Sequence, residues 1–416
     1  MHNVVLLTID TLRQDAVGCY RGEGHEQEKS LTPFIDSVAA EAMRFANMQA
    51  VGPYTQASFP GILTSSYYLD WGRQKKCPKE RTLISEVALR AGLTTAGIHS
   101  NPYISEFFGW KRGWDYFYDS MEEEVTDEVP YVTGDVINRK VARWLEGHTA
   151  GGSPSPFFLW VHYMDVHEPY VPTEDYLARV DPTLSLSRAE MMTLFRDVLL
   201  ARKVDDRDKV AQLRALYRAK VGQVDDFTKE LVHLLQEAGV WDTTSFILTS
   251  DHGDEFAEHG GLSHDGKFFR ELITVPCLIR VAPEEVQEEM TEGGADVSDT
   301  VVSNLDLPPT LCRLAGIPIP DAFQGRSLLP LNRYETGPCF GEAMDKVGAH
   351  EGREDHPTYY CQQGPCKVIY REREDRWEGY QLAEDPAEQE PRGMESPEFE
   401  ALQALLLPRL RRWEKR

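Results

Sequence analysis

Apolar and polar positions along the chain follow two alternating patterns. Short runs of β-branched and aromatic residues indicate buried strands, and the stretches between them carry apolar residues at spacings of three and four, which predict amphipathic helices. This alternation is typical of an α/β protein with a mostly parallel sheet flanked by helices. The strands are expected at Val4–Ile9, Thr94–His99, Phe157–Tyr163, Ser245–Ser250 and Pro276–Val281, and the helices at Leu31–Ala46, Thr82–Ala91, Gly134–Glu146, Ala189–Leu200, Arg207–Ala238 and Asp306–Ala315.

The pattern changes near residue 331. Beyond it come loops rich in Gly, Pro and charge, then strand-like pieces at Lys367–Arg371 and Trp377–Leu382, and a closing amphipathic helix at Glu398–Glu414. We therefore expect a large α/β domain over residues 1–331 and a small α+β subdomain over residues 332–416.

Charge excludes two classes of partner. The 416 residues include 44 Lys and Arg against 68 Asp and Glu, a formal net charge of −24, and no basic block offsets it. Because nucleic acids and anionic membranes both attract positive charge, we expect neither as a partner.

The first ten residues, MHNVVLLTID, lack the basic region and the cleavage site of a signal peptide, and no run reaches the roughly 18 apolar residues of a membrane span. We therefore predict a cytoplasmic protein without a membrane span. The seven cysteines are scattered and odd in number, so we expect reduced thiols instead of a disulfide framework.

Acidic and imidazole side chains follow three of the expected strands. Asp10 ends the first, Asp165 and His167 follow FFLWVHYM, and Asp251 and His252 follow FILTS. Because the carboxyl ends of parallel strands meet at one edge of a sheet, these side chains are expected to gather there. Carboxylates and imidazoles are metal ligands, so the pattern predicts a metal site.

Several segments resemble, in the same order, the sulfatase branch of the alkaline phosphatase superfamily. The opening NVVLLTIDTLRQD is similar to that family's first strand and metal-binding acid, and YRAKVGQVDDFTKELVHLLQEAGVWDTTSFILTSDHGDEFAEHG to its long helix, strand and metal loop. VSNLDLPPTLCRLAGIPIPDAFQGRSLLP and YQLAEDPAEQE are similar to its late helix and C-terminal subdomain. The resemblance implies an alkaline-phosphatase-like catalytic domain over residues 1–331 and an ester hydrolase.

The nucleophile segment departs from that family. Common sulfatases carry Cys-x-Pro-x-Arg, whose Cys or Ser becomes formylglycine, whereas this chain has GPYTQASFPGILTSS. Aligning ILT with the family's Leu-Leu-Thr places Thr55 at the nucleophile and Phe59 at the Arg. The CPKER segment at Cys77 has its Pro one position early and lies after the motif helix. We therefore expect a Thr nucleophile and no formylglycine.

The resemblance also implies the ligands of a divalent cation, Mn²⁺, Zn²⁺, Mg²⁺ or Ca²⁺. Carried over by position, they are Asp10, Thr55, Asp251 and His252, while Thr11 stands where many sulfatases have a second acid. One metal is favoured over two. The residues left open for a second metal or for the substrate are Asp165, His167, His259, His264 and Asn101.

Substrate charge needs basic partners. In the DVHEPY element, His167 matches the family's substrate-contacting His, and His264, Lys267 and Arg13 are the further catalytic candidates. For Arg13 a structural salt bridge to Asp15 is an equal alternative.

Three functions remain open. The first is a metal-dependent hydrolase or transferase of phosphate or phosphonate esters, such as a phosphodiesterase; the second is a sulfuric ester hydrolase; the third is a non-catalytic anion-binding protein. A threonyl phosphate can be attacked at phosphorus, whereas a sulfated Thr lacks the exit by hemiacetal collapse that formylglycine has. The sequence thus favours phosphoryl chemistry on a small anionic ester. It predicts no particular oligomeric state, and specificity is expected in the loops at residues 101–133, 168–205 and 343–366.

Overall fold

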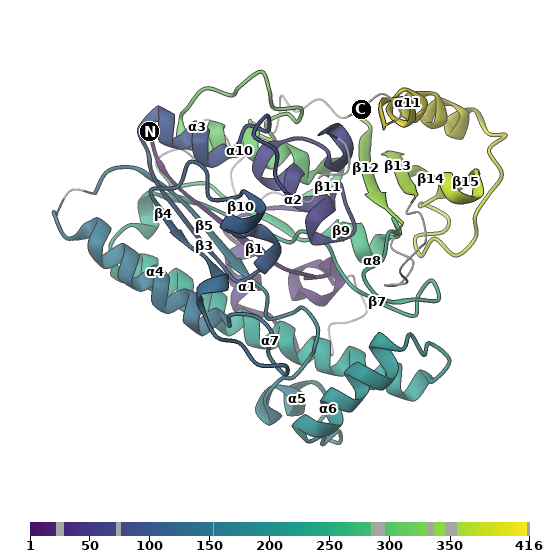
Figure 1. Ribbon diagram of the computed structural model, residues 1–416, viewed down its shortest axis with the longest axis horizontal. Helices are drawn as coiled ribbons and strands as arrows, with labels where there is room; N and C mark the ends of the chain where they lie inside the picture. Colours follow the sequence, from purple (N-terminus) through teal and green to yellow (C-terminus); the bar gives the residue numbers. More distant parts are fainter. Residues whose placement is uncertain are drawn as a thin grey trace.

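A central sheet runs through the molecule in the computed structural model, which describes residues 1–21, 29–71, 76–152, 154–283, 296–330, 337–345 and 356–413 (Figure 1). Within these residues the sheet has nine strands in the order β11-β2-β10-β6-β1-β5-β3-β4, and β9 pairs with β2. The neighbours β6, β1, β5, β3 and β4 are parallel, whereas β10 runs antiparallel to both β6 and β2.

The elements have the following bounds. The strands of the central sheet are β1 Asn3–Ile9, β2 Met43–Gln49, β3 Thr94–His99, β4 Tyr116–Tyr118, β5 Phe157–Tyr163, β6 Thr244–Thr249, β9 Thr274–Val275, β10 Cys277–Arg280 and β11 Asp296–Ser303. The helices are α1 Pro33–Ala39, α2 Thr55–Thr64, α3 Ile84–Ala91, α4 Gly134–Thr149, α5 Glu174–Val180, α6 Arg188–Leu194, α7 Arg207–Glu237, α8 Arg270–Ile273, α10 Leu307–Ala315 and α11 Pro397–Trp413.

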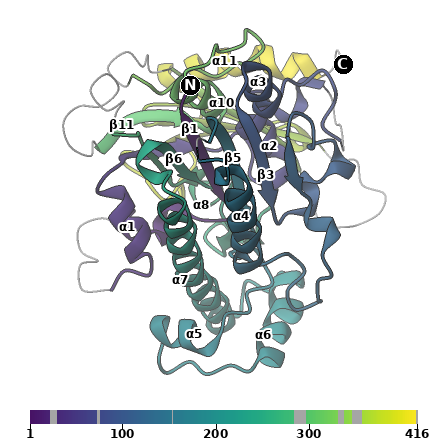
Figure 2. The same ribbon diagram turned by 90° about the vertical axis from the view of Figure 1, so that its left-hand side faces the viewer.

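Strand β1 shows why helices cover both faces of the sheet. Val5, Leu7 and Ile9 join one hydrophobic core, and Val4 and Leu6 join the other. Successive side chains of a strand point to opposite faces, so a strand that is apolar throughout must be covered on both sides. Helices α1, α4 and α7 cover one face and α2, α3 and α10 cover the other (Figure 2).

A separate four-stranded antiparallel sheet follows in the C-terminal part of the described chain. It consists of β12 Cys339–Met344, β13 Pro357–Gln363, β14 Cys366–Arg371 and β15 Arg376–Gln381, and α11 packs on β13 and β14. The sequence predicted the last two strands and the helix but not β12 and β13. The expected domain boundary at residue 331 falls within residues 331–336, outside the described residues, and so do residues 346–355 of one expected specificity loop.

The predicted α/β class and sheet are confirmed, with one wrong assignment. The helix expected at Leu31–Ala46 ends at Ala39, and Met43–Gln49 forms β2 between β10 and β11. Met43 and Phe45 are buried two positions apart, which suits a strand. Their spacing from Ile35 also fits a helix, so the pattern alone could not separate the two elements.

Asp165 joins the end of β5 to two covering helices. Its Oδ2 accepts a hydrogen bond from the backbone N–H of Gly134 at the start of α4 (2.8 Å), and Lys220 Nζ of α7 lies 3.7 Å from its Oδ1. Both side chains of the ion pair are almost fully buried. Burial raises the pKa of Asp165 and lowers that of Lys220, since each charge is costly away from water.

Among the described residues no helix combines the length and the apolar character that crossing a membrane requires. All seven cysteines lie in described positions, and none of them forms a disulfide there.

We predict that Asp165→Asn lowers the free energy of unfolding by about 3–5 kcal/mol, because Lys220 is left as a buried charge without its counterion. Urea denaturation followed by circular dichroism measures the change. The double variant Asp165→Asn/Lys220→Met is expected to be more stable than the single variant. Equal stability of the single variant and the wild type would show that the pair carries no such constraint.

Candidate active site

Polar side chains from four neighbouring strands meet at the carboxyl edge of the central sheet. Asp10 follows β1, Asn101 comes two residues after β3, and Asp251 and His252 come after β6. His162 projects from β5 itself. All five are fully buried. The parallel arrangement of β6, β1, β5 and β3 therefore brings together residues more than 240 positions apart.

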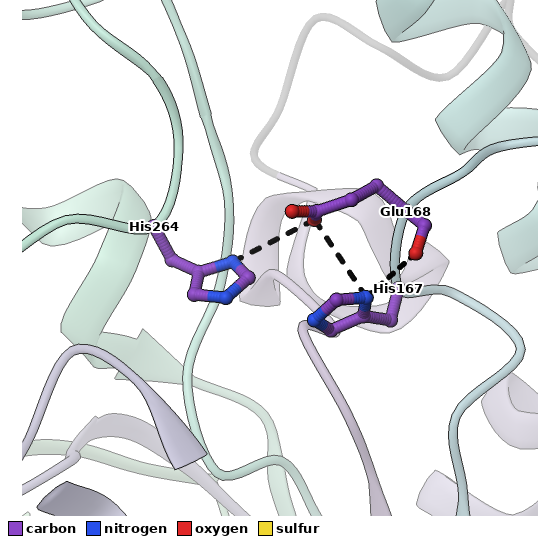
Figure 3. Close-up of side chains that lie close together, drawn as sticks. All are labelled: His167, Glu168 and His264. Carbon is purple, nitrogen blue, oxygen red and sulfur yellow. Dashed lines mark hydrogen bonds and ion pairs between the residues drawn. The ribbon is translucent and has the colours of Figure 1, made fainter. Parts of the chain in front are cut away.

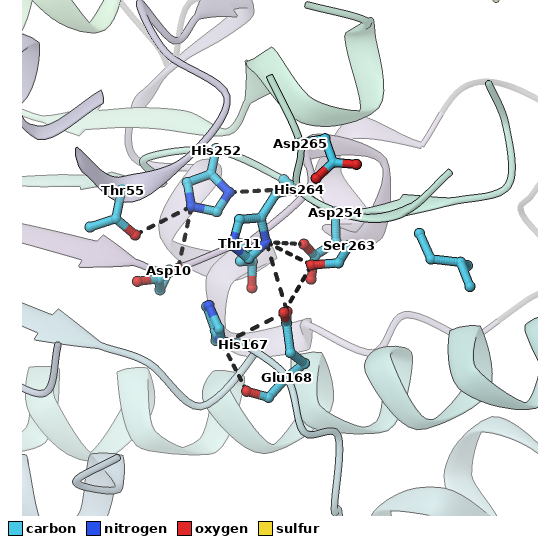
Figure 4. A network of polar contacts seen from close by, with 12 residues as sticks. Asp10, Thr11, Thr55, His167, Glu168, His252, Asp254, Ser263, His264 and Asp265 are labelled. Atoms are coloured by element: carbon cyan, nitrogen blue, oxygen red, sulfur yellow. Dashed lines mark hydrogen bonds and ion pairs between the residues drawn. The ribbon is translucent and has the colours of Figure 1, made fainter. Parts of the chain in front are cut away.

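Asp10, Asp251 and His252 form the centre of this cluster, and Figure 4 shows Asp10 and His252 with Thr55 beside them. His252 Nε2 lies 3.6 Å from Asp10 Oδ1 and 3.4 Å from Asp251 Oδ2. Neither of these two carboxylate oxygens has a hydrogen-bond partner. The other oxygen of Asp10 accepts a hydrogen bond from Asn101 Nδ2 (2.6 Å) and lies 3.3 Å from His162 Nε2.

Two neighbouring buried carboxylates can both be ionised only if positive charge compensates them. Burial and the nearby charge of Asp10 raise the pKa of Asp251 well above its ordinary value. Burial also favours the protonated form of Asp10, but the imidazoles around it outweigh this effect and lower its pKa. Burial, with His264 close by, lowers the pKa of His252 to about 3, so this ring is neutral and its nitrogen can act as a ligand. Two carboxylates and a neutral imidazole are a donor set that fits a divalent cation.

Thr55 lies beside this donor set as the first residue of α2. Its Oγ1 is 3.5 Å from His252 Nε2 and 3.4 Å from Asn101 Nδ2, which donates to it. The N-terminus of a helix attracts anions through its backbone N–H groups. Ser58, one turn later, donates to the carbonyl of Asp251 (2.7 Å) and so fixes the helix to the loop that carries Asp251 and His252.

Two positions where the sequence departs from common sulfatases have plain structural roles. Phe59 is fully buried, and its ring packs edge-on against His162 (5.1 Å between centroids). Thr11 has a left-handed backbone (φ 56°) and donates its N–H to Asp251 Oδ1 (3.3 Å). Position 11 therefore gives the cluster a backbone donor in place of a second acid.

His167 and His264 form a second group next to the first. Their ring centroids are 5.0 Å apart, and the His264 centroid is 4.5 Å from that of His252. Glu168 and Asp254 complete the group (Figure 3 shows Glu168 with the two rings). Although burial opposes protonation, the charges of Glu168, Asp10 and Asp254 raise the pKa of His167 to about 9.

Arg13 and Lys267 are committed to acidic partners. Arg13 is buried and pairs with Asp15 (2.7 Å) and Glu258 (2.7 Å). The sequence analysis gave such a salt bridge as the alternative to a catalytic role for this residue. Lys267 Nζ contacts Glu255 Oε2 at 2.7 Å. Both charges are therefore used within the fold.

Asp165 and His259 do not belong to the second group and contact other residues instead. Asp165 holds Lys220 and the start of α4, as described above. His259 Nδ1 is 2.6 Å from Glu271 Oε1, and its ring stacks on Phe269 at 3.6 Å. The structure thus brings His167, His264 and Asn101 to the site and assigns Asp165 and His259 to structural contacts.

Sequence reasoning missed His162, Glu168 and Asp254. His162 is a polar residue inside a buried strand, aligned with Thr8 of β1 and His99 of β3. The presence of His99 and His162 on two neighbouring buried strands is a signal in the sequence from which His162 could have been predicted. Glu168 and Asp254 lie close to predicted site residues in DVHEPY and DHGDE. The sequence of a loop does not indicate whether the side chain of an acid in it points into the site or into solvent.

Two family models match the chain. The sulfatase model matches residues 2–317, and the model of the N-sulphoglucosamine sulphohydrolase C-terminal region matches residues 258–416. Among curated relatives, the multifunctional alkaline phosphatase superfamily protein PehA of Trinickia caryophylli is 25% identical over 79% of this chain and 76% of its own length. The N-acetylglucosamine-6-O-sulfatase of Bacteroides thetaiotaomicron is 24% identical over 93% of this chain and 81% of its own.

Solved structures agree on the fold. One, solved in complex with its substrate D-glucosamine-2-N,6-O-disulfate, superposes with a TM-score of 0.78 at 20% identity and covers 100% of this chain and 98% of that one. The phosphonate monoester hydrolase of Agrobacterium radiobacter has a TM-score of 0.75 at 19% identity, covering 100% and 96%. Because the sulfatase model spans most of the chain, this protein belongs to the sulfatase family and is a hydrolase of that superfamily.

Proposed function

We propose that this protein hydrolyses, or transfers the phosphoryl group of, phosphate or phosphonate esters, with Thr55 as the nucleophile beside a divalent cation. The ligands proposed for that cation are Asp10, Thr55, Asp251 and His252. The observation that carries the proposal is the position of Thr55 Oγ1, which lies 3.5 Å from His252 Nε2 next to two carboxylate oxygens that lack hydrogen bonds. When bound, the cation would lower the pKa of the Thr55 hydroxyl and stabilise charge on the ester.

The protein's own residues supply the rest of the arrangement. Asn101 donates to both Asp10 and Thr55, and so fixes the distance between the acid and the nucleophile. The N-terminus of α2 directs backbone N–H groups to the anionic group. His167 and His264 would face the non-bridging oxygens of the phosphate or phosphonate group and supply positive charge to them. Arg13 and Lys267 are each paired with an acid and are not available for this role.

The chemistry of the nucleophile favours phosphorus over sulfur. In the first step the Thr55 Oγ–P bond forms and the ester P–O bond breaks, so the alcohol leaves. In the second step water, or an acceptor alcohol in a transferase, attacks phosphorus and Thr55 Oγ leaves. A sulfated Thr has no exit by hemiacetal collapse. A divalent cation also stabilises the more highly charged phosphoryl group better.

A small pocket with a volume of about 30 Å³ lies beside Thr55. Its walls combine aromatic rings, among them Tyr103 and Trp110, with the basic side chains of Lys76 and Arg81. The aromatic walls suit an apolar part of a leaving alcohol next to the ester group. Sulfuric ester hydrolysis remains the second candidate, because the C-terminal part of the chain matches the sulphohydrolase model.

We expect purified enzyme to turn over an aryl phosphate, a phosphodiester or a phosphonate monoester faster than the matching aryl sulfate. Thr55→Ala should lower turnover by about 10³-fold or more, because the covalent route is lost. Thr55→Ser should keep measurable activity, since the hydroxyl remains. Steady-state kinetics on paired esters would refute the proposal if the sulfate were preferred or if Thr55→Ala were fully active.

Removal of the cation with a chelator should abolish activity, and Mn²⁺, Zn²⁺, Mg²⁺ or Ca²⁺ should restore it. Asp251→Ala and His252→Ala are each expected to lose bound metal while keeping the fold, as measured by elemental analysis and circular dichroism. The matched control is His148→Ala, which removes an imidazole stacked on Trp144 away from the cluster. Wild-type metal content in both site variants would show that the ligands are assigned wrongly.

A further inference from the structure

His162 is a polar ring enclosed in the interior of the central sheet. It is fully buried in β5, and its register partners are Thr8 on β1 and His99 on β3. Phe59 packs edge-on against the ring (5.1 Å between centroids), and Trp160 stacks on it (6.0 Å). A buried polar group without a partner is costly, so the contacts of the two ring nitrogens decide what this imidazole does.

The Nδ1 atom of His162 belongs to a chain of hydrogen bonds that fixes where the ring carries its proton. Trp160 Nε1 donates to Thr8 Oγ1 (3.0 Å), and an indole N–H can only donate. Thr8 Oγ1 lies 2.8 Å from His162 Nδ1 and 3.4 Å from the carbonyl oxygen of Val161. The second distance is too long for a good O–H···O hydrogen bond, so the hydroxyl donates to Nδ1. A neutral imidazole that accepts at Nδ1 carries its proton on Nε2.

The Nε2 atom faces Asp10. It lies 3.3 Å from Asp10 Oδ2, the oxygen that also accepts the hydrogen bond of Asn101 Nδ2 (2.6 Å). The other tautomer of His162 would set a nitrogen lone pair against a carboxylate, which is repulsive, so this contact requires the same proton position as the chain through Thr8. Two N–H groups are thus directed at Oδ2, while Oδ1 has no hydrogen bond and lies 3.6 Å from His252 Nε2.

We propose that His162 is a positioning residue for Asp10, and that Trp160 and Thr8 set the tautomer in which it acts. The ring itself touches neither the ester nor the cation. Its N–H holds Asp10 Oδ2 and so leaves Oδ1 as the oxygen that binds the cation. The inference rests on the proposed function, because the ligand role of Asp10 belongs to that proposal. It also accounts for the polar pair Thr8 and His162, which lie side by side within two otherwise apolar strands.

Nitrogen NMR of the metal-stripped full chain tests the tautomer without using activity. In protein labelled with ¹⁵N-histidine, the chemical shifts distinguish protonated from unprotonated ring nitrogens, and His162→Gln identifies the signals of this ring by their absence. We expect the proton on Nε2 in the wild type. Thr8→Val keeps the shape of the side chain without its hydroxyl and should shift the Nδ1 signal, because the donor is lost. A proton on Nδ1 in the wild type would overturn the proposal.

Two amide substitutions at position 162 separate positioning from packing. The amide nitrogen of Gln reaches nearly as far as Nε2, whereas that of Asn reaches only as far as Nδ1. His162→Asn should therefore weaken Mn²⁺ binding by about 10–100-fold, and His162→Gln should restore it to within a few-fold of the wild type. The electron paramagnetic resonance signal of free Mn²⁺ measures the affinity, and circular dichroism checks the fold of both variants. Wild-type affinity in His162→Asn, or an equal loss in both folded variants, would overturn the proposal.

Asp251→Ala separates this inference from the proposed function. If this variant binds Mn²⁺ as tightly as the wild type, the proposed ligands are wrong and the proposed function fails, whatever the tautomer of His162. If Asp251→Ala loses Mn²⁺ while His162→Asn binds it as the wild type does, the proposed function stands and the positioning role of His162 is overturned.

Discussion

Asp10 and Asp251 are buried at the ends of neighbouring strands, with His252 Nε2 3.6 Å from one carboxylate and 3.4 Å from the other. Taking such charges out of water costs of the order of several kcal/mol per ion unless a counter-charge is present. Among the described residues no Lys or Arg pairs with these two carboxylates; the side-chain nitrogens close to them belong to imidazoles and to the amide of Asn101. A divalent cation would compensate these two carboxylates, and the proposed function depends on its presence.

The same constraint explains the position of Thr55. Helix α2 begins beside the carboxylates, and Ser58 donates a hydrogen bond to the carbonyl of Asp251, so Thr55 and the loop that carries Asp251 and His252 are held as one unit. Phe59, at the position expected to match the family's Arg, is buried and packs on His162. Positive charge that an Arg would bring from α2 must then come from the opposite side, where His167 and His264 lie.

Hydrophobic periodicity predicted the strands, and the residues that follow the strands predicted part of the site. Strands β3 and β5 were predicted to the residue, and Asp10, Asp251 and His252 were identified because parallel strands deliver their ends to one edge. Periodicity alone missed strand β2, because its apolar positions also fit a helix. Asp165 was expected near the metal, yet Lys220, 55 positions away on α7, pairs with it. Such long-range partners, like the direction of Glu168, are fixed only by packing and leave no local signal.

The role of Thr55 can be tested by peptide mass spectrometry of enzyme quenched during turnover of an aryl phosphate. We expect an added phosphoryl group on Thr55 during turnover, and unmodified Thr55 and Cys77 in the resting enzyme. Thr55→Val, which keeps the shape of the side chain without its hydroxyl, should show no label. Formylglycine at position 55 or 77, or a phosphoryl group trapped on another residue, would contradict the account.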